Sequence, residues 1–291
     1  MSTTTACQTL IPPNGDAPAI GRIAALYQYR ELLWMLAWRD IRVRYKHSVL
    51  GIAWAVLPPV LMVGIFTFVF GTINQINPAG LTGHATLPYS LFAFAGLVPW
   101  TFFANGLTAA TSSLVSNRQL VTKIYFPREV FPLAAIVSAF IDFLIASVVL
   151  VGYATFLHFS SGDWRYELQI SLLLLPIVVA VQVVLMLGLS LMLSMANLFF
   201  RDVGFLFRSI IQVWMFFTCV LYQLEATAGW KRLAIQLNPM TPIIRAYRDC
   251  LILGRNPFDL AFASASLSAV AALILGWMWF GRRECRFAEC I

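Results

Sequence analysis

The stretch "LAWRDIRVRYKHSVLGIAW", residues 36–54, changes its chemical character in the middle. Arg39, Arg42, Arg44 and Lys46 stand directly before Val49, and no charged residue follows for more than twenty positions. A helix that crosses a bilayer needs ~20 apolar residues, and cations beside such a run commonly mark a membrane surface. The stretch therefore predicts a basic segment at the membrane surface that leads into a membrane span.

The composition of the whole chain supports a polytopic membrane protein. Of its 291 residues, 60% are hydrophobic and only 11% are charged, whereas soluble domains carry roughly 25% charged residues. The net charge of +7 is assigned to cytoplasmic loops and anionic headgroups rather than to nucleic acid. The five cysteines are odd in number and form no CxxC pair, which argues against a disulfide framework or a zinc site.

Six apolar stretches are long enough to span a bilayer, and an all-α fold is expected because a barrel would show short alternating strands. The expected spans lie near 49–72, 87–114, 131–157, 170–196, 204–224 and 260–280. A disordered cytoplasmic tail is expected over 1–21, an amphipathic interface helix over 22–48, the membrane domain over 49–281 and a second tail over 282–291.

The distribution of basic residues predicts the orientation of the chain in the membrane. If the N-terminus is cytoplasmic, fourteen of the twenty Lys and Arg residues fall on the cytoplasmic side and six fall outside. The positive-inside rule then places both termini in the cytoplasm.

Residues 34–46 form two neighbouring arcs when they are placed on a helix at 100° per residue. Trp34, Trp38, Ile41 and Tyr45 share one arc, and three cations share the next: Arg39, Arg42 and Lys46. Such a helix lies in the headgroup layer with its aromatics buried and its cations on phosphates. The alternative is a basic anchor that fixes topology and has no other role.

Four segments, taken in order, resemble the permease subunits of polysaccharide ABC exporters. They are "RDIRVRYKHSVLGIAWAVLPP" (39–59), "PWTFFANGL" (99–107) continuing through "SNRQLVTKIYFPRE" (116–129), "NLFFRDV" (197–203) and "NPMTPIIRAYRD" (238–249). The form "WRDIRVRY" is more similar to the O-antigen and teichoic-acid branches than to the capsule branch. The resemblance implies a homodimer that exports a polyprenyl-diphosphate-linked polysaccharide and contacts membrane lipids.

The chain contains no GxxxxGK[ST] segment that would hold the phosphates of ATP, so it is not expected to be an enzyme. The resemblance therefore implies two separate ATPase subunits that bind ATP and Mg, and no cofactor or metal in this chain.

The resemblance also implies roles for two sets of residues on the cytoplasmic side. The interface helix comprises Trp34, Trp38, Arg39, Arg42, Arg44, Tyr45 and Lys46. Residues expected to couple to the ATPase are Asn117, Lys123, Phe126, Pro127, Arg128, Arg201 and Asp202. The alternatives are a solvated basic loop over 116–129 and a structural clamp between helix ends at Arg201 and Asp202.

The region 225–258 carries five of the six external cations, and the resemblance implies that it forms re-entrant gate helices. The gate residues are Lys231, Asn238, Pro239, Arg245 and Arg248, whose cations would meet a diphosphate or an anionic sugar. The alternative is a lid closed by ion pairs through Glu225 and Asp249.

Aromatic side chains are abundant, and seven of them are candidates for a channel along which a glycan slides. They are Trp100, Phe102, Phe103, Trp214, Phe216, Phe217 and Tyr222. The alternative is that these rings pack inside the protein or face lipid.

Asp142 is the one carboxylate that falls well inside an expected span, and Arg208 is its expected partner at similar depth. A proton relay through Asp142 would make the chain a secondary transporter instead, but no second buried acid and no internal repeat accompany it. A membrane-embedded enzyme is disfavoured because no DxD occurs and His47, His84 and His158 are scattered.

Overall fold

The computed structural model describes residues 26–46, 51, 53–69, 88–123, 127–161, 170–221, 235 and 237–283. Every regular element in these residues is a helix. The α-helices are α2 (Arg30–Tyr45), α3 (Ala53–Phe66), α5 (Tyr89–Ser116), α6 (Arg118–Lys123), α7 (Val130–Ser161), α8 (Leu175–Phe199), α9 (Asp202–Phe216), α11 (Met240–Arg248) and α12 (Leu260–Arg283). A 3-10 helix, η3 (Ile170–Leu174), precedes α8, and a π-helix, η5 (Asp249–Leu253), follows α11.

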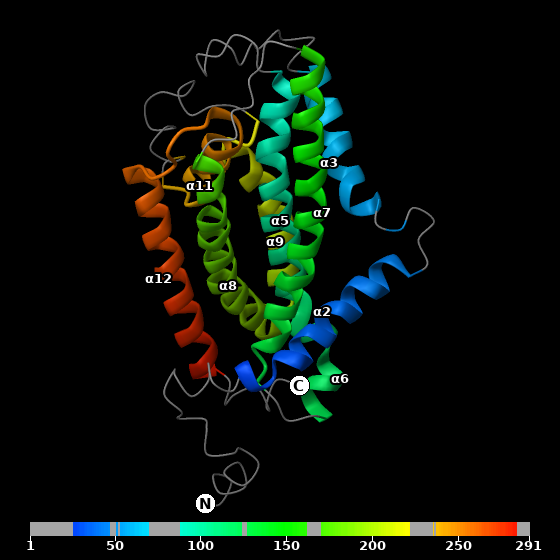
Figure 1. Cartoon of the computed structure of the whole chain (residues 1–291). Coiled ribbons are helices and arrows are strands. Elements are labelled where there is room, and N and C mark those ends of the chain that lie inside the picture. Colours follow the sequence, from blue (N-terminus) through cyan, green and yellow to red (C-terminus); the bar gives the residue numbers. More distant parts are fainter. Residues whose placement is uncertain are drawn as a thin grey trace, which may run out of the picture.

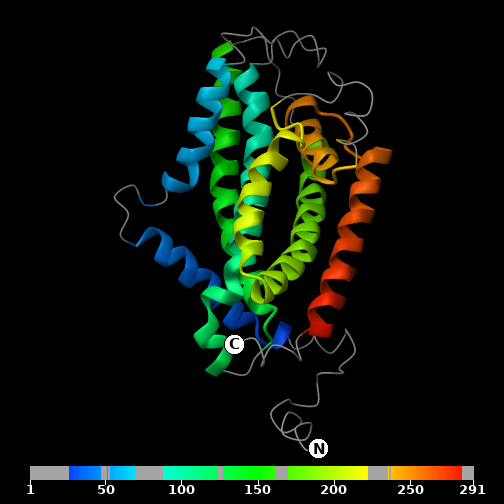
Figure 2. The same ribbon diagram turned by 180° about the vertical axis from the view of Figure 1, so that it is seen from behind.

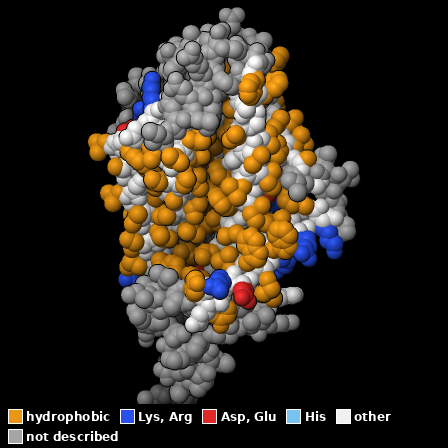
Figure 3. All heavy atoms as spheres, viewed as in Figure 1, with side chains coloured by type: hydrophobic (Ala, Val, Ile, Leu, Met, Phe, Trp, Pro, Cys, Tyr) orange, Lys and Arg blue, Asp and Glu red, His pale blue; other side chains and the backbone are white. Residues whose placement is uncertain are grey.

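Six helices run side by side along the long axis of the molecule, namely α3, α5, α7, α8, α9 and α12 (Figures 1 and 2). The helices α2 and α6 lie at one end of this bundle, which we call the α2 end, and α11 lies at the other, the α11 end. Hydrophobic side chains cover the face of the bundle between these ends, and basic side chains gather beneath it where α2 lies (Figure 3). This distribution fits a belt of lipid around the bundle.

Four helices are long and apolar enough to cross a membrane: Tyr89–Ser116, Val130–Leu157, Ser171–Phe199 and Leu260–Arg282. They occupy the second, third, fourth and sixth expected spans, and the prediction of an all-helical membrane protein is confirmed for the described residues. The helices α3 and α9 occupy the places of the first and fifth expected spans, but they have only 14 and 15 residues. The six-span count therefore stays a prediction.

The helix α5 forms the centre of the bundle and packs against α3, α7, α8, α9 and α11. It is the least apolar of the four long helices, with a mean hydropathy of 1.3 against 1.9 to 2.8 for the others, and it is the most deeply buried. Phe103 and Leu107 of α5 are fully enclosed, and Met186 of α8 lies in the same core. Neighbouring helices thus shield most of α5 from lipid.

The helices α8 and α12 cross closely because two glycines face each other. A Cβ atom on Gly188 would overlap the backbone of Ala272, and one on Gly276 would overlap the carbonyl group of Gly188. Small residues at a crossing let two helix backbones approach, and van der Waals packing then holds them together in lipid.

Candidate functional site at the α2 end of the bundle

The helix α2 has three faces, of which one is turned toward the protein. Leu36 and Ala37 are buried against the bundle, where α2 packs mainly on α7. Trp34 and Trp38 are about half exposed and stack with ring centroids 6.5 Å apart, whereas Arg42 and Lys46 are exposed on a separate face. The aromatic and basic arcs expected from the sequence therefore both remain accessible to lipid or to a partner.

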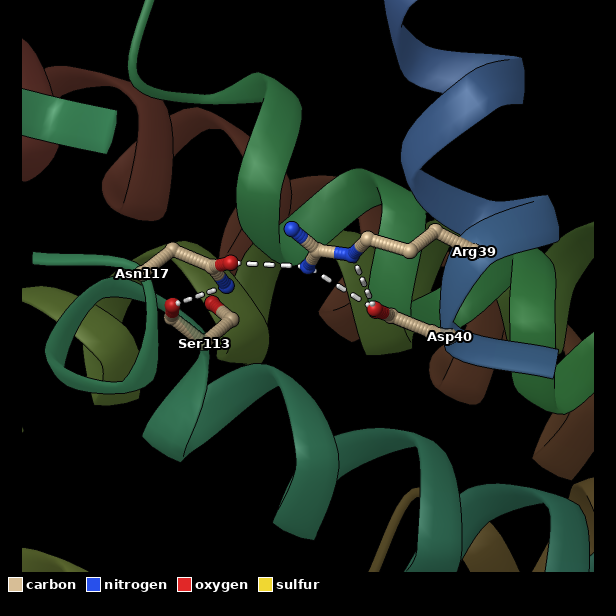
Figure 4. A network of polar contacts seen from close by, with 4 residues as sticks. All are labelled: Arg39, Asp40, Ser113 and Asn117. Atoms are coloured by element: carbon tan, nitrogen blue, oxygen red, sulfur yellow. Dashed lines mark hydrogen bonds and ion pairs between the residues drawn. The ribbon is translucent and has the colours of Figure 1, made fainter. Parts of the chain in front are cut away.

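A polar network joins α2 to the end of α5 (Figure 4). The guanidinium of Arg39 donates hydrogen bonds to Asn117 Oδ1 at 2.7 Å and to its neighbour Asp40 at 2.9 Å. The amide nitrogen of Asn117 in turn donates to the carbonyl oxygen of Ser113 at 2.8 Å. Asn117 lies between α5 and α6, so this network connects α2 to the residue that directly precedes α6.

A second attachment joins the last turn of α2 to the middle of α7. Arg44 forms an ion pair with Asp142, and the hydroxyl of Tyr45 donates a hydrogen bond to the same carboxylate at 2.7 Å. Burial, and then the hydrogen bond to Asp142, raise the pKa of Tyr45 to about 12, so its hydroxyl keeps its proton and remains a donor.

These contacts correct the expected pairing of Asp142 with Arg208, which is wrong. Asp142 is held by two residues of α2, whereas Arg208 is exposed on α9 with its guanidinium 5.9 Å from the centroid of the Phe205 ring. The helix α2 packs extensively on α7, which carries Asp142, whereas α9, which carries Arg208, does not.

The segment expected to couple to the ATPase lies at the same end of the bundle as α2. The short helix α6 ends at Lys123, and the side chain of Lys123 and all of Phe126 lie outside the described residues. Pro127 and Arg128 form the turn before α7, where their carbonyl groups accept hydrogen bonds from Val130 and Phe131. The coupling role of this segment stays a prediction.

Asn197 forms the link between helix ends that sequence analysis considered for Arg201 and Asp202. Its side chain is buried, accepts a hydrogen bond from the Gly204 backbone at 2.8 Å and donates one to the Thr111 carbonyl at 3.0 Å. Asn197 thereby joins α8, α9 and α5. Arg201 and Asp202 are both exposed and form no ion pair with any described residue, so both are accessible to a partner.

At the α11 end, Arg248 closes the turn that follows α9. It is buried and donates hydrogen bonds to the carbonyl oxygens of Cys219, at 2.9 Å, and Val220. Its guanidinium also lies 3.7 Å from the centroid of the Phe92 ring. Burial lowers the pKa of Arg248 to about 10, which still leaves it charged near neutral pH. In this arrangement Arg248 stabilises the protein interior.

The remaining gate residues surround α11. Asn238 donates hydrogen bonds to the Phe217 carbonyl at 3.1 Å and to the Thr218 hydroxyl at 2.9 Å, so it fixes the start of α11 to the end of α9. Pro239 is the residue before α11, and Lys231 lies outside the described residues.

Arg245 is half exposed, 3.8 Å from Asp249 and 3.5 Å from Asp259, so part of the ion-pair alternative is present. The gate itself stays a prediction.

The candidate channel aromatics divide into two groups. Trp100, Phe102 and Phe103 are buried inside the chain, and the Phe103 ring packs edge-on against Trp214 at 5.4 Å. Exposed rings at the end of α9 are Phe216 and Phe217, whereas Tyr222 lies outside the described residues. Interior packing accounts for the first group, and only the second presents a ring face to the surroundings.

The polar groups at the α2 end hold helices together. Donors and acceptors are paired between α2, α5 and α7, and no three His, Cys, Asp or Glu side chains gather into a possible metal site within the described ranges. Two attachments that join one surface helix to two membrane helices are suited to transmitting a mechanical displacement.

Comparison with known proteins assigns the family. Residues 31–252 match the ABC-2 type transporter family. The "O-antigen export system permease protein RfbA" of Myxococcus xanthus is 29% identical over 92% of this chain and 98% of the relative. A protein of the same name from Klebsiella pneumoniae is 27% identical over 90% of this chain and 95% of the relative. The "Polysialic acid transport protein KpsM" of Escherichia coli is 20% identical over 84% of this chain. The chain therefore belongs to the ABC-2 type transporter family of membrane proteins.

Proposed function

We propose that this chain is the channel-forming membrane subunit of an ATP-driven exporter that moves an O-antigen-like, lipid-linked polysaccharide across the bacterial inner membrane. The proposal is carried by the match to O-antigen export permeases over nearly the full length of both chains. Teichoic acid or capsule is the alternative cargo, and the weaker match to a polysialic acid transport protein keeps capsule open.

A separate ATPase, which would bind ATP and Mg, is the proposed source of energy, and this chain would need no cofactor of its own. The proposal is supported by the position of α2 and α6, which lie together beyond the membrane belt at one end of the bundle. The exposed cations of α2, Arg42 and Lys46, suit an acidic partner surface or anionic headgroups. The α2 end would then be cytoplasmic, together with both termini.

A homodimer is proposed because α9 exposes an apolar strip that no described helix covers. Leu206, Ile210 and Val213 are each more than half exposed on this strip. Two copies would enclose the channel between them, with α3 and α9 completing six spans in each copy. The re-entrant gate is proposed at the α11 end.

The contacts of Asp142 support this function over secondary transport. A proton relay needs a carboxylate that is free to exchange its proton with a second group along a path. Asp142 is instead held by the cation Arg44 and the donor Tyr45. These contacts are those of a structural attachment for α2.

The test is ATP turnover by the purified chain, alone and with candidate ATPases, in nanodiscs. We expect turnover only from the complex. Arg42→Glu should lower complex formation at least tenfold, and Arg255→Glu, the same charge change on an exposed residue at the α11 end, should leave it intact. The proposal is refuted if no ATPase associates and the chain alone moves solute down a proton gradient.

A further inference from the structure

A cavity of about 400 Å³ opens between the last turn of α2 and the helices α3, α5 and α7. Its volume lies within the range of sites that hold small molecules. Phe143 in its lining belongs to the packed core, and Arg44 and Asp142 form the attachment of α2, but the polar side chains of α5 that line the cavity belong to neither. The cavity lies on the side of α5 that faces α3 and α7, away from α9.

One wall is a polar strip on α5, formed by Thr101, Asn105, Thr108 and Ser112. The spacing of four, three and four residues places these side chains on one face of the helix. A polar strip of this kind inside a membrane helix needs water, a ligand or another polar group beside it.

The hydrogen bonds of the strip determine which ligand it accepts. The hydroxyls of Thr101, Thr108 and Ser112 donate to backbone carbonyls of their own helix, those of Val98, Ala104 and Ala109. Each hydroxyl has one proton, so these oxygens present only lone pairs to the cavity. Asn105 is exposed and makes no hydrogen bond to any described residue. The three hydroxyls therefore suit a ligand that brings hydrogen-bond donors, and the amide of Asn105 can both donate and accept.

The opposite wall is apolar and includes Trp54 and Pro58 of α3 and Phe143 of α7. Arg44 and Asp142 close the α2 end of the cavity as an ion pair without net charge. Only one N–H of Arg44 is used by Asp142, so the guanidinium keeps further donors. The neutral end and the acceptor-rich wall disfavour a bare phosphate. Together with the aromatic wall they suit a ring that has hydroxyls and an apolar face.

We propose that this cavity binds a sugar ring carried by a membrane lipid, with its hydroxyls on the α5 strip and its C–H face against Trp54. The inference deepens the proposed function and rests on it only for the source of the sugar. The exported lipid-linked glycan and a resident glycolipid share this chemistry.

The test uses the complex of this chain with its ATPase in nanodiscs and a dodecyl glucoside that bears a diazirine. Labelling should map to peptides that contain Trp54, Asn105 or Phe143, and dodecyl maltoside should displace it at least tenfold better than dodecylphosphocholine. Asn105→Leu and Thr108→Val should each lower labelling by about tenfold. Thr155→Val, which removes a hydroxyl from an exposed position of α7, is the matched control and should change nothing.

Labelling outside the cavity, or equal displacement by dodecylphosphocholine, overturns the proposal. Thr108→Val is nearly isosteric, so it keeps the test valid if Asn105→Leu fails to fold. Export measured on the same variants identifies the source. A parallel loss of export assigns the sugar to the exported glycan, and normal export with lost labelling assigns it to a resident glycolipid. Labelling of a chain that recruits no ATPase would refute the proposed function and leave the sugar site standing.

Discussion

Replacing Asp142 by alanine should release the end of α2 from α7, because Asp142 accepts both contacts that hold the end of this helix. The Arg44 side chain is 41% exposed, so solvent limits the ion pair to ~0.5–1 kcal/mol. The hydrogen bond from Tyr45 to a carboxylate is worth about 1.5 kcal/mol. Together they amount to about 2 kcal/mol, which raises the undocking equilibrium of α2 about thirtyfold. Arg44 can turn to solvent, so no buried unpaired charge adds to this figure.

The assay is the labelling rate of a cysteine at position 37 in a background without the native cysteines. Ala37 is fully buried between α2 and the bundle, so Ala37→Cys reacts with a maleimide only when α2 undocks. In this background Asp142→Ala should raise the rate about thirtyfold. Asp142→Asn keeps an acceptor for Tyr45 and should raise it only about fivefold, the equivalent of ~1 kcal/mol.

The control is Asp259→Ala, which removes a carboxylate that pairs with Arg245 at the α11 end. It should leave labelling at position 37 unchanged. A rate for Asp142→Ala within twofold of the parent, or an equal increase in the control, would refute the view that these two contacts hold α2.

Three further predictions concern the stability of the bundle. Gly96→Ala places a methyl group 2.9 Å from the Val220 carbonyl oxygen and against Arg248, so the melting temperature should fall by several degrees. An unchanged melting temperature contradicts the close packing of Gly96 against Arg248. Gly188→Ala should lower the free energy of unfolding by ~1–3 kcal/mol, since α12 must move away from α8. The control is Gly64→Ala, whose added methyl group meets no atom within 4 Å and should not destabilise the protein. Burial raises the pKa of Asp249 to about 6, above its unfolded value. The free energy of unfolding should therefore rise by on the order of 2–3 kcal/mol as the pH falls from 7 to 4. Asp249→Asn should remove this pH dependence, and a pH dependence that persists in the variant contradicts its assignment to Asp249.

Residue spacing in the sequence predicted those features that depend only on the geometry of a single helix. The aromatic and basic arcs of α2 follow from residue spacing on a helix, and both are exposed in the structure. The third face, with Leu36 and Ala37, was not distinguished, because apolar residues suit a lipid surface and a protein surface equally well. The α5 strip has a spacing of four, three and four residues, but the aromatic residues around it dominate the local pattern.

Long-range pairing could not be predicted in the same way. Similar depth in the expected spans made Arg208 the predicted partner of Asp142, and only the packing of α2 on α7 brings Arg44 to that carboxylate instead. Arg248 has the chemistry of a phosphate ligand in a loop rich in cations. Its role as an interior donor depends on the turn at Cys219, whose φ of 53° exposes two carbonyl groups to it.

The central position of α5 has a consequence for the synthesis of this protein. It precedes α7, α8 and α12 in the chain and is the least apolar of the four, so it gains the least free energy from entering lipid by itself. Of the helices beside its strip of hydroxyl and amide groups, α2 and α3 precede α5 but α7 follows it, so until α7 is made the strip lacks part of its protein cover. Stable insertion of α5 must therefore follow the synthesis of at least α7, and a chain that is truncated before α7 should be a substrate for membrane proteases.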